Sequence, residues 1–349
     1  MEPYAGVIEG FFGREFSWAD RKAYADFLAE NRFDFYIYAP KGDRYLRQHW
    51  NEDWPEETWQ ELYELREAYR ERGIAFGLGL SPFDVQQNYD QRARKALLAK
   101  TEKLNELDPD ILCILFDDMK GDVAELASIQ IDMAHTIAGA SRATRHIVCP
   151  SYYSDDPVLE KVFGNAPAGY LTDLGQGLDP KLDVFWTGPL VCSTDYPRDH
   201  LDDVAQRLGR RPFLWDNYPV NDGAKKSLHL HLKPFRPHPI ADLVSGHAIN
   251  PMNQPWLSRL SMLTFEASYG EDYDPATAFK EALKGEGCPP ELAEQLAKDV
   301  DGFFDDGLAK LPKDDLLAAY KKLPPHPYRD EVVRWLSGEY EFDPACLTD

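Results

Sequence analysis

The sequence of 349 residues lacks long apolar runs, which excludes the commonest kind of membrane protein. Nothing in it approaches the roughly 18 consecutive apolar residues of a membrane-spanning helix. The first six residues, Met1 to Gly6, contain no basic start, no apolar core and no cleavage site. We therefore expect neither a membrane partner nor a secretory signal.

Paired cysteines are also missing. The five cysteines are odd in number and form no C-x-x-C pair, so neither a disulfide framework nor a zinc or thiol redox site is indicated. Three of them lie in apolar runs, where a buried thiol is the ordinary interpretation. This usage predicts a reducing location, the cytoplasm. They are Cys113, Cys149, Cys192, Cys288 and Cys346.

Basic residues are scarce relative to acidic ones. The chain has 38 Lys and Arg against 60 Asp and Glu, a formal net charge of −22. Such a surface repels phosphate backbones, so we expect no nucleic-acid partner. The nine histidines form no H-x-H or H-E-x-x-H pattern, and only His247 lies near the end of a predicted strand. We expect no metal and no cofactor. The alternative, a metal-dependent barrel hydrolase, would require the observation that chelation abolishes activity.

What the sequence does contain is a regular alternation of apolar runs with amphipathic helical stretches. This pattern is typical of an α/β fold with a parallel sheet. Eight runs suggest a (β/α)8 TIM barrel with a small C-terminal helical extension, and we predict a catalytic barrel over 1–270 and the extension over 271–349. A capping box at Ser17 predicts the start of the first helix. The predicted strands are 4–12, 34–40, 74–81, 110–117, 145–152, 182–187, 212–217 and 244–250.

Polar and aromatic residues follow these runs at the carboxyl end of each predicted strand, where TIM barrels place their active sites. Carboxylates and amides bind sugar hydroxyls, and aromatic rings pack on the apolar faces of sugars. The strand ends therefore predict a carbohydrate site. They read Glu9-Gly10-Phe11-Phe12-Gly13, Ala39-Pro40-Lys41, Phe116-Asp117-Asp118, Trp186-Thr187-Gly188-Pro189, Trp215-Asp216-Asn217-Tyr218 and Asn250-Pro251.

Five of these blocks, in the same order, resemble glycoside hydrolase family 84, the bacterial β-N-acetylglucosaminidases and eukaryotic O-GlcNAcases. The resemblance covers roughly residues 4–265. It implies a retaining exo-β-N-acetylglucosaminidase that uses substrate-assisted catalysis, in which the 2-acetamido oxygen of the sugar attacks the anomeric carbon and forms an oxazoline. Asp117 would accept the acetamido N–H and stabilise the intermediate, whereas Asp118 would protonate the leaving oxygen and later activate water.

The chemistry of two adjacent carboxylates supports this division of roles. Both cannot ionise easily in one low-dielectric pocket, so one should have a raised pKa, as a general acid requires. The competing interpretation is that successive strand residues face opposite sides, which leaves one aspartate structural. Only an irregular backbone at the strand end would direct both Asp117 and Asp118 inward.

The resemblance also implies the residues that bind the substrate, a glycoconjugate bearing β-linked N-acetylglucosamine (GlcNAc). Tyr153 would contact the acetamido group and leaving oxygen, and Lys41 with the Gly10 carbonyl would hold hydroxyls. Asn217, Asp222 and Asn250 would bind the hydroxyls at positions 3, 4 and 6. Trp215 would wall the acetamido pocket, together with Cys149, Trp186, Thr187 and Val191. Each aromatic or amide could instead serve packing or a turn.

Alternatives remain open at this point. One is a hydrolase of another GlcNAc-containing glycan, such as hyaluronan, chitin or cell-wall fragments, and protein-linked O-GlcNAc is among the candidate substrates. Another is a non-catalytic GlcNAc-binding barrel. The helical extension could also support a homodimer.

Overall fold

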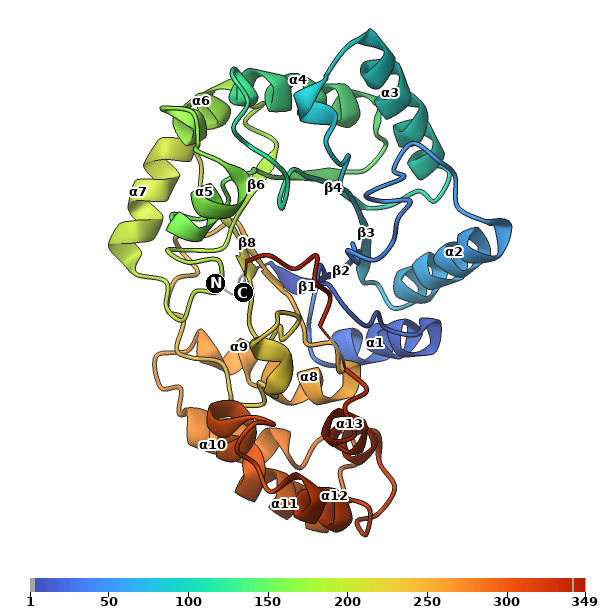
Figure 1. Cartoon of the computed structure of the whole chain (residues 1–349), viewed down its shortest axis with the longest axis vertical. Helices are drawn as coiled ribbons and strands as arrows, with labels where there is room; N and C mark the ends of the chain where they lie inside the picture. Colours follow the sequence, from blue (N-terminus) through green and yellow to red (C-terminus); the bar gives the residue numbers. More distant parts are fainter. Residues whose placement is uncertain (1–3, 341, 349) are drawn as a thin grey trace.

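The computed structural model describes residues 4–340 and 342–348, and its centre is a closed barrel of eight parallel strands (Figure 1). Each strand pairs with the next along the chain, and the eighth pairs with the first. All eight predicted strands are present, so the prediction of a (β/α)8 TIM barrel is confirmed. The strands are β1 (Ala5–Glu9), β2 (Phe35–Tyr38), β3 (Ala75–Leu80), β4 (Ile111–Leu115), β5 (Arg145–Cys149), β6 (Asp183–Trp186), β7 (Phe213–Asp216) and β8 (Gly246–Ile249).

The helices form an outer ring around these strands (Figure 1). The side chain of Ser17 accepts a hydrogen bond from the Asp20 N–H, so the first helix begins where the capping box predicts. The ring consists of α1 (Trp18–Glu30), α2 (Glu56–Glu71), α3 (Gln91–Asn105), α4 (Leu126–Ala140), α5 (Pro157–Phe163), α6 (Tyr170–Gly177), α7 (Arg198–Leu208), α8 (Pro255–Met262) and α9 (Phe265–Ser268).

The connection between β7 and β8 differs from the regular pattern. Eight helices are expected between and after the strands, but this link, which is described throughout, has only a 3₁₀ turn at Lys226–Leu228. Four prolines occupy the connection, and proline disrupts helix interiors because it removes a donor and clashes with the preceding turn. They are Pro219, Pro234, Pro237 and Pro239. The link consequently remains an irregular loop beside the barrel mouth.

The C-terminal part is helical, as predicted, and packs below the barrel in the view of Figure 1. It comprises α10 (Pro275–Ala282), α11 (Pro290–Asp301) with a π-helical turn at Gly302–Asp306, α12 (Lys313–Tyr320) and α13 (Pro327–Leu336). One hydrophobic cluster contains Met252, Leu257 and Leu260 from the barrel side as well as Phe303 and Trp335 from the extension. The two parts therefore share buried apolar surface.

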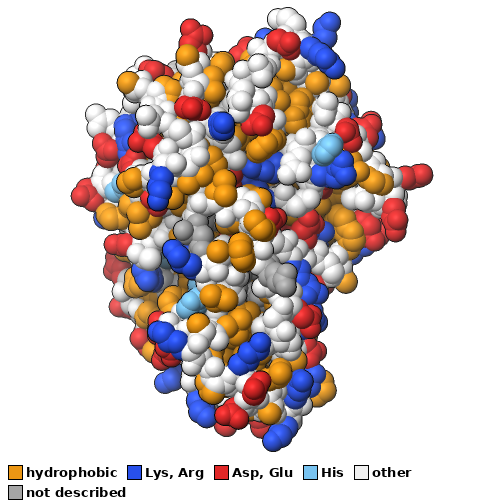
Figure 2. Space-filling model, viewed as in Figure 1, with side chains coloured by type: hydrophobic (Ala, Val, Ile, Leu, Met, Phe, Trp, Pro, Cys, Tyr) orange, Lys and Arg blue, Asp and Glu red, His pale blue; other side chains and the backbone are white. Residues whose placement is uncertain are grey.

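The predicted boundary at residue 270 falls between α9 and α10, and a division into two domains stays a prediction. Parts of two predictions lie outside the described residues: the predicted domains include 1–3, 341 and 349, and the expected absence of a secretory signal concerns the first six residues, of which 1–3 are not described. Within the described ranges, the helices are all too short or too polar to cross a membrane. Charged side chains of both signs are spread over the face that Figure 2 shows.

Candidate active site

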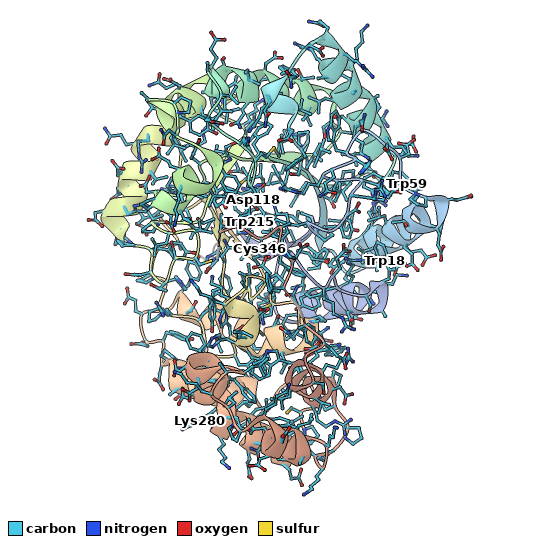
Figure 3. All side chains as sticks on the ribbon, in the orientation of Figure 1. Trp18, Trp59, Asp118, Trp215, Lys280 and Cys346 are labelled. Carbon is cyan, nitrogen blue, oxygen red and sulfur yellow. The ribbon has the colours of Figure 1, made fainter. Side chains whose placement is uncertain are left out.

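The carboxyl ends of the strands surround one pocket, and twelve of the thirteen predicted site residues line it. They come from seven of the strand ends or the loops that follow. Figure 3 shows two of them, Asp118 and Trp215, close together at the centre of the barrel. The twelve are Gly10, Lys41, Asp117, Asp118, Cys149, Tyr153, Thr187, Val191, Trp215, Asn217, Asp222 and Asn250.

Asp117 and Asp118 both reach this pocket because the backbone changes conformation after β4. Asp118 has a φ of 55°, in the left-handed region. Non-glycine residues rarely adopt this conformation, although Asp and Asn tolerate it better than most. An extended backbone would have placed the two side chains on opposite faces of the strand. The irregularity that the paired arrangement requires is therefore present.

Lys41 lies between the two carboxylates. Its ammonium group donates a hydrogen bond to Oδ2 of Asp117 and stands 3.7 Å from Oδ2 of Asp118. The Lys41 side chain is 3% exposed, so water screens these charges weakly. One buried cation thus partly compensates two adjacent anions.

Asp118 is poised as a proton donor by its surroundings. Burial raises the pKa of its carboxyl group, Lys41 opposes this rise, and the charge of Asp117 adds to it. The Tyr153 hydroxyl donates to Oδ1 of Asp118 at 2.9 Å, and the Arg47 guanidinium donates to the Asp118 carbonyl at 2.9 Å. These bonds fix the position of the carboxyl group. A raised pKa keeps a carboxylic acid protonated closer to neutral pH, as general acid catalysis needs.

One carboxyl oxygen of Asp117, which lines the pocket, has no hydrogen-bond partner within the described part of the chain. This oxygen, Oδ1, is buried. A buried carboxylate oxygen without a partner is costly, because it has lost water and gained nothing in exchange. A donor arriving with a ligand, such as an amide N–H, would remove this cost.

Amide side chains join the ends of neighbouring strands along one side of the pocket, from β1 through β8 and β7 to the loop after β6. The backbone N–H of Gly10 donates to Oδ1 of Asn250 at 3.2 Å, and Nδ2 of Asn250 donates to Oδ1 of Asn217 at 2.9 Å. The indole N–H of Trp215 donates to the same Asn217 oxygen at 3.0 Å, while Nδ2 of Asn217 donates to the Val191 carbonyl at 2.8 Å. This network holds four walls of the pocket in fixed positions.

Glycine is required at position 10 because the Trp215 ring lies against its backbone. A Cβ atom built on Gly10 would stand 2.3 Å from Cζ2 of Trp215, closer than any real contact. The indole therefore packs on the floor of the pocket only when residue 10 has no side chain.

Asp222 approaches the pocket from the loop after β7. Its Oδ2 accepts the backbone N–H of Phe12 at 2.8 Å. Burial raises the pKa of Asp222 to about 6, against the lowering effect of the Phe12 N–H and of Lys226. In its ionised form this carboxyl group can accept hydrogen bonds from hydroxyl groups.

The remaining wall is apolar and differs from the prediction at one residue. Cys149, Thr187 and Val191 line the pocket, and burial raises the pKa of the Cys149 thiol, which makes it inert. Trp186 does not line it: its indole N–H lies 3.0 Å from Nε2 of His200 on α7, so the ring faces the helices. The prediction for Trp186 missed the alternation of β6, in which Phe185 faces inward against Trp215.

Several lining residues were not predicted from the sequence. Phe12 stands in the first strand-end block, so its motif could have identified it, and Lys226 follows Asp222 on the same loop. Cys346 and Thr348 come from the far end of the chain, where no pattern pointed to a site. The additional lining residues are Phe12, Cys192, Val220, Gly223, Lys226, Cys346 and Thr348.

A larger groove adjoins this pocket and shares Cys192, Asn217 and Lys226 with it. Its cavity volume is about 590 Å³, and it is lined by Tyr218 and Phe235 as well as basic side chains. Among the residues that the structure describes, no group of three or more His, Cys, Asp or Glu is arranged to hold a metal ion. The pocket instead combines paired carboxylates, amides and a tryptophan floor.

Comparison with known families agrees with this arrangement. The family model described as beta-N-acetylglucosaminidase matches residues 5–298, which include the barrel and all twelve lining residues named above. The chain belongs to this family. The resemblance to glycoside hydrolase family 84 seen in the strand-end motifs is thereby confirmed.

Individual members of the β-N-acetylglucosaminidase family are similar over most of this chain. The proteins named Protein O-GlcNAcase from Rattus norvegicus and Mus musculus are each 27% identical over 290 residues, which is 80% of this chain. The chain spans 30% of the length of these mammalian relatives. A mutant of the O-GlcNAc hydrolase of Thermobaculum terrenum superposes with a TM-score of 0.76 at 28% identity, covering 96% of this chain and 81% of that one.

Proposed function

We propose that this protein is a retaining exo-β-N-acetylglucosaminidase that removes terminal β-linked GlcNAc by substrate-assisted catalysis. The observation that carries the proposal is the pair Asp117 and Asp118, brought into one pocket by the left-handed backbone of Asp118. The two carboxylates have different surroundings, as two different roles require.

In the first step the acetamido oxygen of the sugar attacks the anomeric carbon, and the bond to the leaving oxygen breaks. Asp117 accepts the acetamido N–H with its unpartnered Oδ1 and stabilises the positive charge of the oxazoline. Asp118 gives its proton to the leaving oxygen, assisted by its raised pKa.

In the second step Asp118, now a carboxylate, takes a proton from water while the water oxygen attacks the anomeric carbon. The oxazoline opens, and two inversions restore the β configuration. Asp222 and Asn250 close the pocket around the hydroxyls far from the scissile bond, which favours terminal over internal sugars. Lys41 compensates the charge of Asp117 in the first step and the charges of both carboxylates once Asp118 has lost its proton.

Protein-linked O-GlcNAc is the natural substrate that we propose. The relatives are named O-GlcNAcase and O-GlcNAc hydrolase. The adjoining groove, which shares Asn217 and Lys226 with the pocket, has aromatic and polar walls against which a polypeptide could pack. The cytoplasmic location rests on cysteine usage alone, and the homodimer stays a prediction.

The first test is release of the fluorescent aglycone from an aryl β-N-acetylglucosaminide in the presence of EDTA. Wild type should turn over, and Asp117→Asn should lose more than about a hundredfold in kcat, because intermediate formation loses its charged acceptor. Asp84→Asn is the matched control, since Asp84 also has a left-handed backbone but is exposed and lies outside the pocket.

Three results would redirect the assignment. Loss of wild-type activity with EDTA would favour metal-dependent hydrolysis. Folded wild type that binds a GlcNAc-derived thiazoline without turnover would favour a sugar-binding barrel. Rapid cleavage inside hyaluronan or chitin polymers, with little release of terminal sugars, would contradict the exo-acting mode.

A further inference from the structure

The segment 342–348 lies across the mouth of the barrel. After α13 the chain turns back over the strands and runs toward their centre, as the red trace in Figure 1 shows. Cys346 and Thr348 line the same pocket as Asp117, Asp118 and Trp215. Figure 3 shows Cys346 next to Trp215.

Residues 346–348, which follow the turn in this segment, present their side chains to the pocket as an extended polypeptide would. Cys346 and Thr348 are half-buried in the pocket, whereas Leu347 between them is 57% exposed. This alternation is the two-residue period of an extended backbone. A substrate polypeptide carrying a modified Ser, Thr or Cys would likewise direct a small side chain with an oxygen or sulfur atom toward the aspartates.

The pocket leaves little room while the segment is in place. Its cavity volume is about 40 Å³, enough for roughly three water molecules. Sites for small molecules usually enclose about 300–1,000 Å³. A GlcNAc unit with its acetamido group therefore cannot enter without movement of a wall, and the strands and the amide network form the rigid walls.

The segment is the wall that is easiest to displace. Phe342 and Leu347 are two of the six exposed large apolar side chains found in the described ranges, so the segment has buried little of its apolar surface. Its hydrogen bonds include a local turn, in which the N–H groups of Ala345 and Cys346 bond to Asp343. Both bonds of this turn lie within the segment.

We propose that residues 342–348 are an intramolecular ligand of the catalytic pocket, which a GlcNAc-bearing substrate has to displace. The pocket is thereby assigned a second ligand class, an extended polypeptide with small polar side chains in alternate positions. The inference rests on the proposed function only in naming the sugar that competes with it. Occupancy of the pocket by the segment weakens the apparent binding of sugar. The apparent Kd equals the Kd of the open pocket divided by the fraction of molecules in which the pocket is open.

The test uses a variant of the 349-residue chain in which residues 342–348 are replaced by seven glycines, which carry no side chains for the pocket to hold. Calorimetric titration with a GlcNAc-derived thiazoline should give at least about tenfold tighter binding than wild type. The KM for an aryl substrate should fall by a similar factor while kcat changes less than about twofold. Leu347→Ala is the matched control, because this exposed side chain points away from the pocket.

A second measurement needs no sugar. A fluorescent peptide with the sequence of residues 342–348 should bind the glycine variant, with wild type binding it at least about tenfold more weakly. A scrambled peptide should bind neither protein. Saturating thiazoline should release the peptide from the variant.

The outcomes separate this inference from the proposed function. Peptide binding by the variant without any hydrolysis would support the intramolecular ligand and overturn the enzymatic assignment. Hydrolysis with unchanged thiazoline affinity in the variant and no peptide binding would overturn the inference alone. Weaker thiazoline binding in the folded variant would also overturn it, because the segment would then be part of the sugar site.

Discussion

At the scale of single residues, the site depends on an unusual backbone conformation at one aspartate. The φ of 55° at Asp118 directs its carboxyl group to the side that Asp117 occupies, with Lys41 between them. The same conformation restricts substitutions, since Asn adopts it with less strain than Ala. Asparagine variants therefore separate the chemistry of these carboxylates from the shape of the turn.

The two aspartates should respond differently to the leaving group. Asp118→Asn should lower kcat about 10²- to 10⁴-fold on substrates with poor leaving groups, because proton donation is lost. Activated aryl substrates need little protonation, so they should lose far less. Asp117→Asn should impair both substrate types, since formation of the intermediate is affected. Parallel losses on both substrates for both variants, measured under saturation, would contradict these roles.

Most of this site could be predicted from the sequence because strand ends are local in the chain. Residues such as Lys41 and Asp117 follow apolar runs closely, and closure of the barrel then brings them together, whereas Asp222, on the loop after β7, was implied by the family resemblance. The prediction that Trp186 lines the pocket was wrong, because a four-residue strand is too short a pattern to show which side chains face inward. Cys346 could not be found, since its position depends on how the extension packs rather than on its neighbours.

At the scale of elements, the extension is tied to the barrel through a helix cap. Glu331 on α13 accepts the backbone N–H groups of Trp256 at 3.1 Å and Leu257 at 2.8 Å, at the start of α8. These are donors that a helix leaves unsatisfied at its N-terminus. The Glu331 residue is 2% exposed, and its burial raises the pKa of the carboxyl group to about 8.

This pKa predicts how stability changes with pH. The folded value lies above the ordinary 4.5, so the contribution of Glu331 is fully present below about pH 4.5 and is lost as pH rises through 8. The loss amounts to roughly 2–5 kcal/mol. Thermal unfolding should show a Tm that falls between pH 5 and 8.5 in wild type and much less in Glu331→Gln.

The control for this measurement is Glu294→Gln, an exposed residue on α11. Its Tm should follow the wild-type curve at every pH. If the Glu331→Gln curve ran parallel to wild type instead, the buried carboxyl group would not be the source of the pH dependence.

Predicting elements from the sequence succeeded where burial is uniform. Parallel strands covered on both faces read as apolar runs, as Ile111 to Leu115 does in β4. The β7–β8 link was expected to follow the repeat, but its prolines prevent a helix. The cap made by Glu331 gives no local signal, because donor and acceptor are more than 70 residues apart.

At the scale of the whole molecule, the barrel and extension share one buried cluster. Trp335 is 1% exposed, packs 5.3 Å from the ring of Phe303 and donates its indole N–H to the Ser227 carbonyl at 3.1 Å. Ser227 belongs to the β7–β8 link, which also supplies the pocket residue Lys226. Loss of this packing should therefore destabilise the barrel as well as the extension.

Trp335→Ala should cost about 3–5 kcal/mol of unfolding free energy, because it leaves a large cavity in the shared cluster. Differential scanning calorimetry should show a single unfolding transition in both proteins, and the Tm of the variant should be lower than that of wild type. Trp59→Ala, at a half-buried position on α2, should cost less. Two separated transitions with only one displaced would mean that barrel and extension unfold independently.

The closure of β8 on β1 has a consequence for biosynthesis. Gly10 and Asn250 meet across 240 residues of chain, and Phe12 meets Asp222 across 210. A chain emerging from the ribosome exposes both aspartates long before the strand that completes the pocket has been translated. Prematurely terminated fragments would thus carry Asp117 and Asp118 without a complete pocket, and only chains synthesised past the eighth strand could form it.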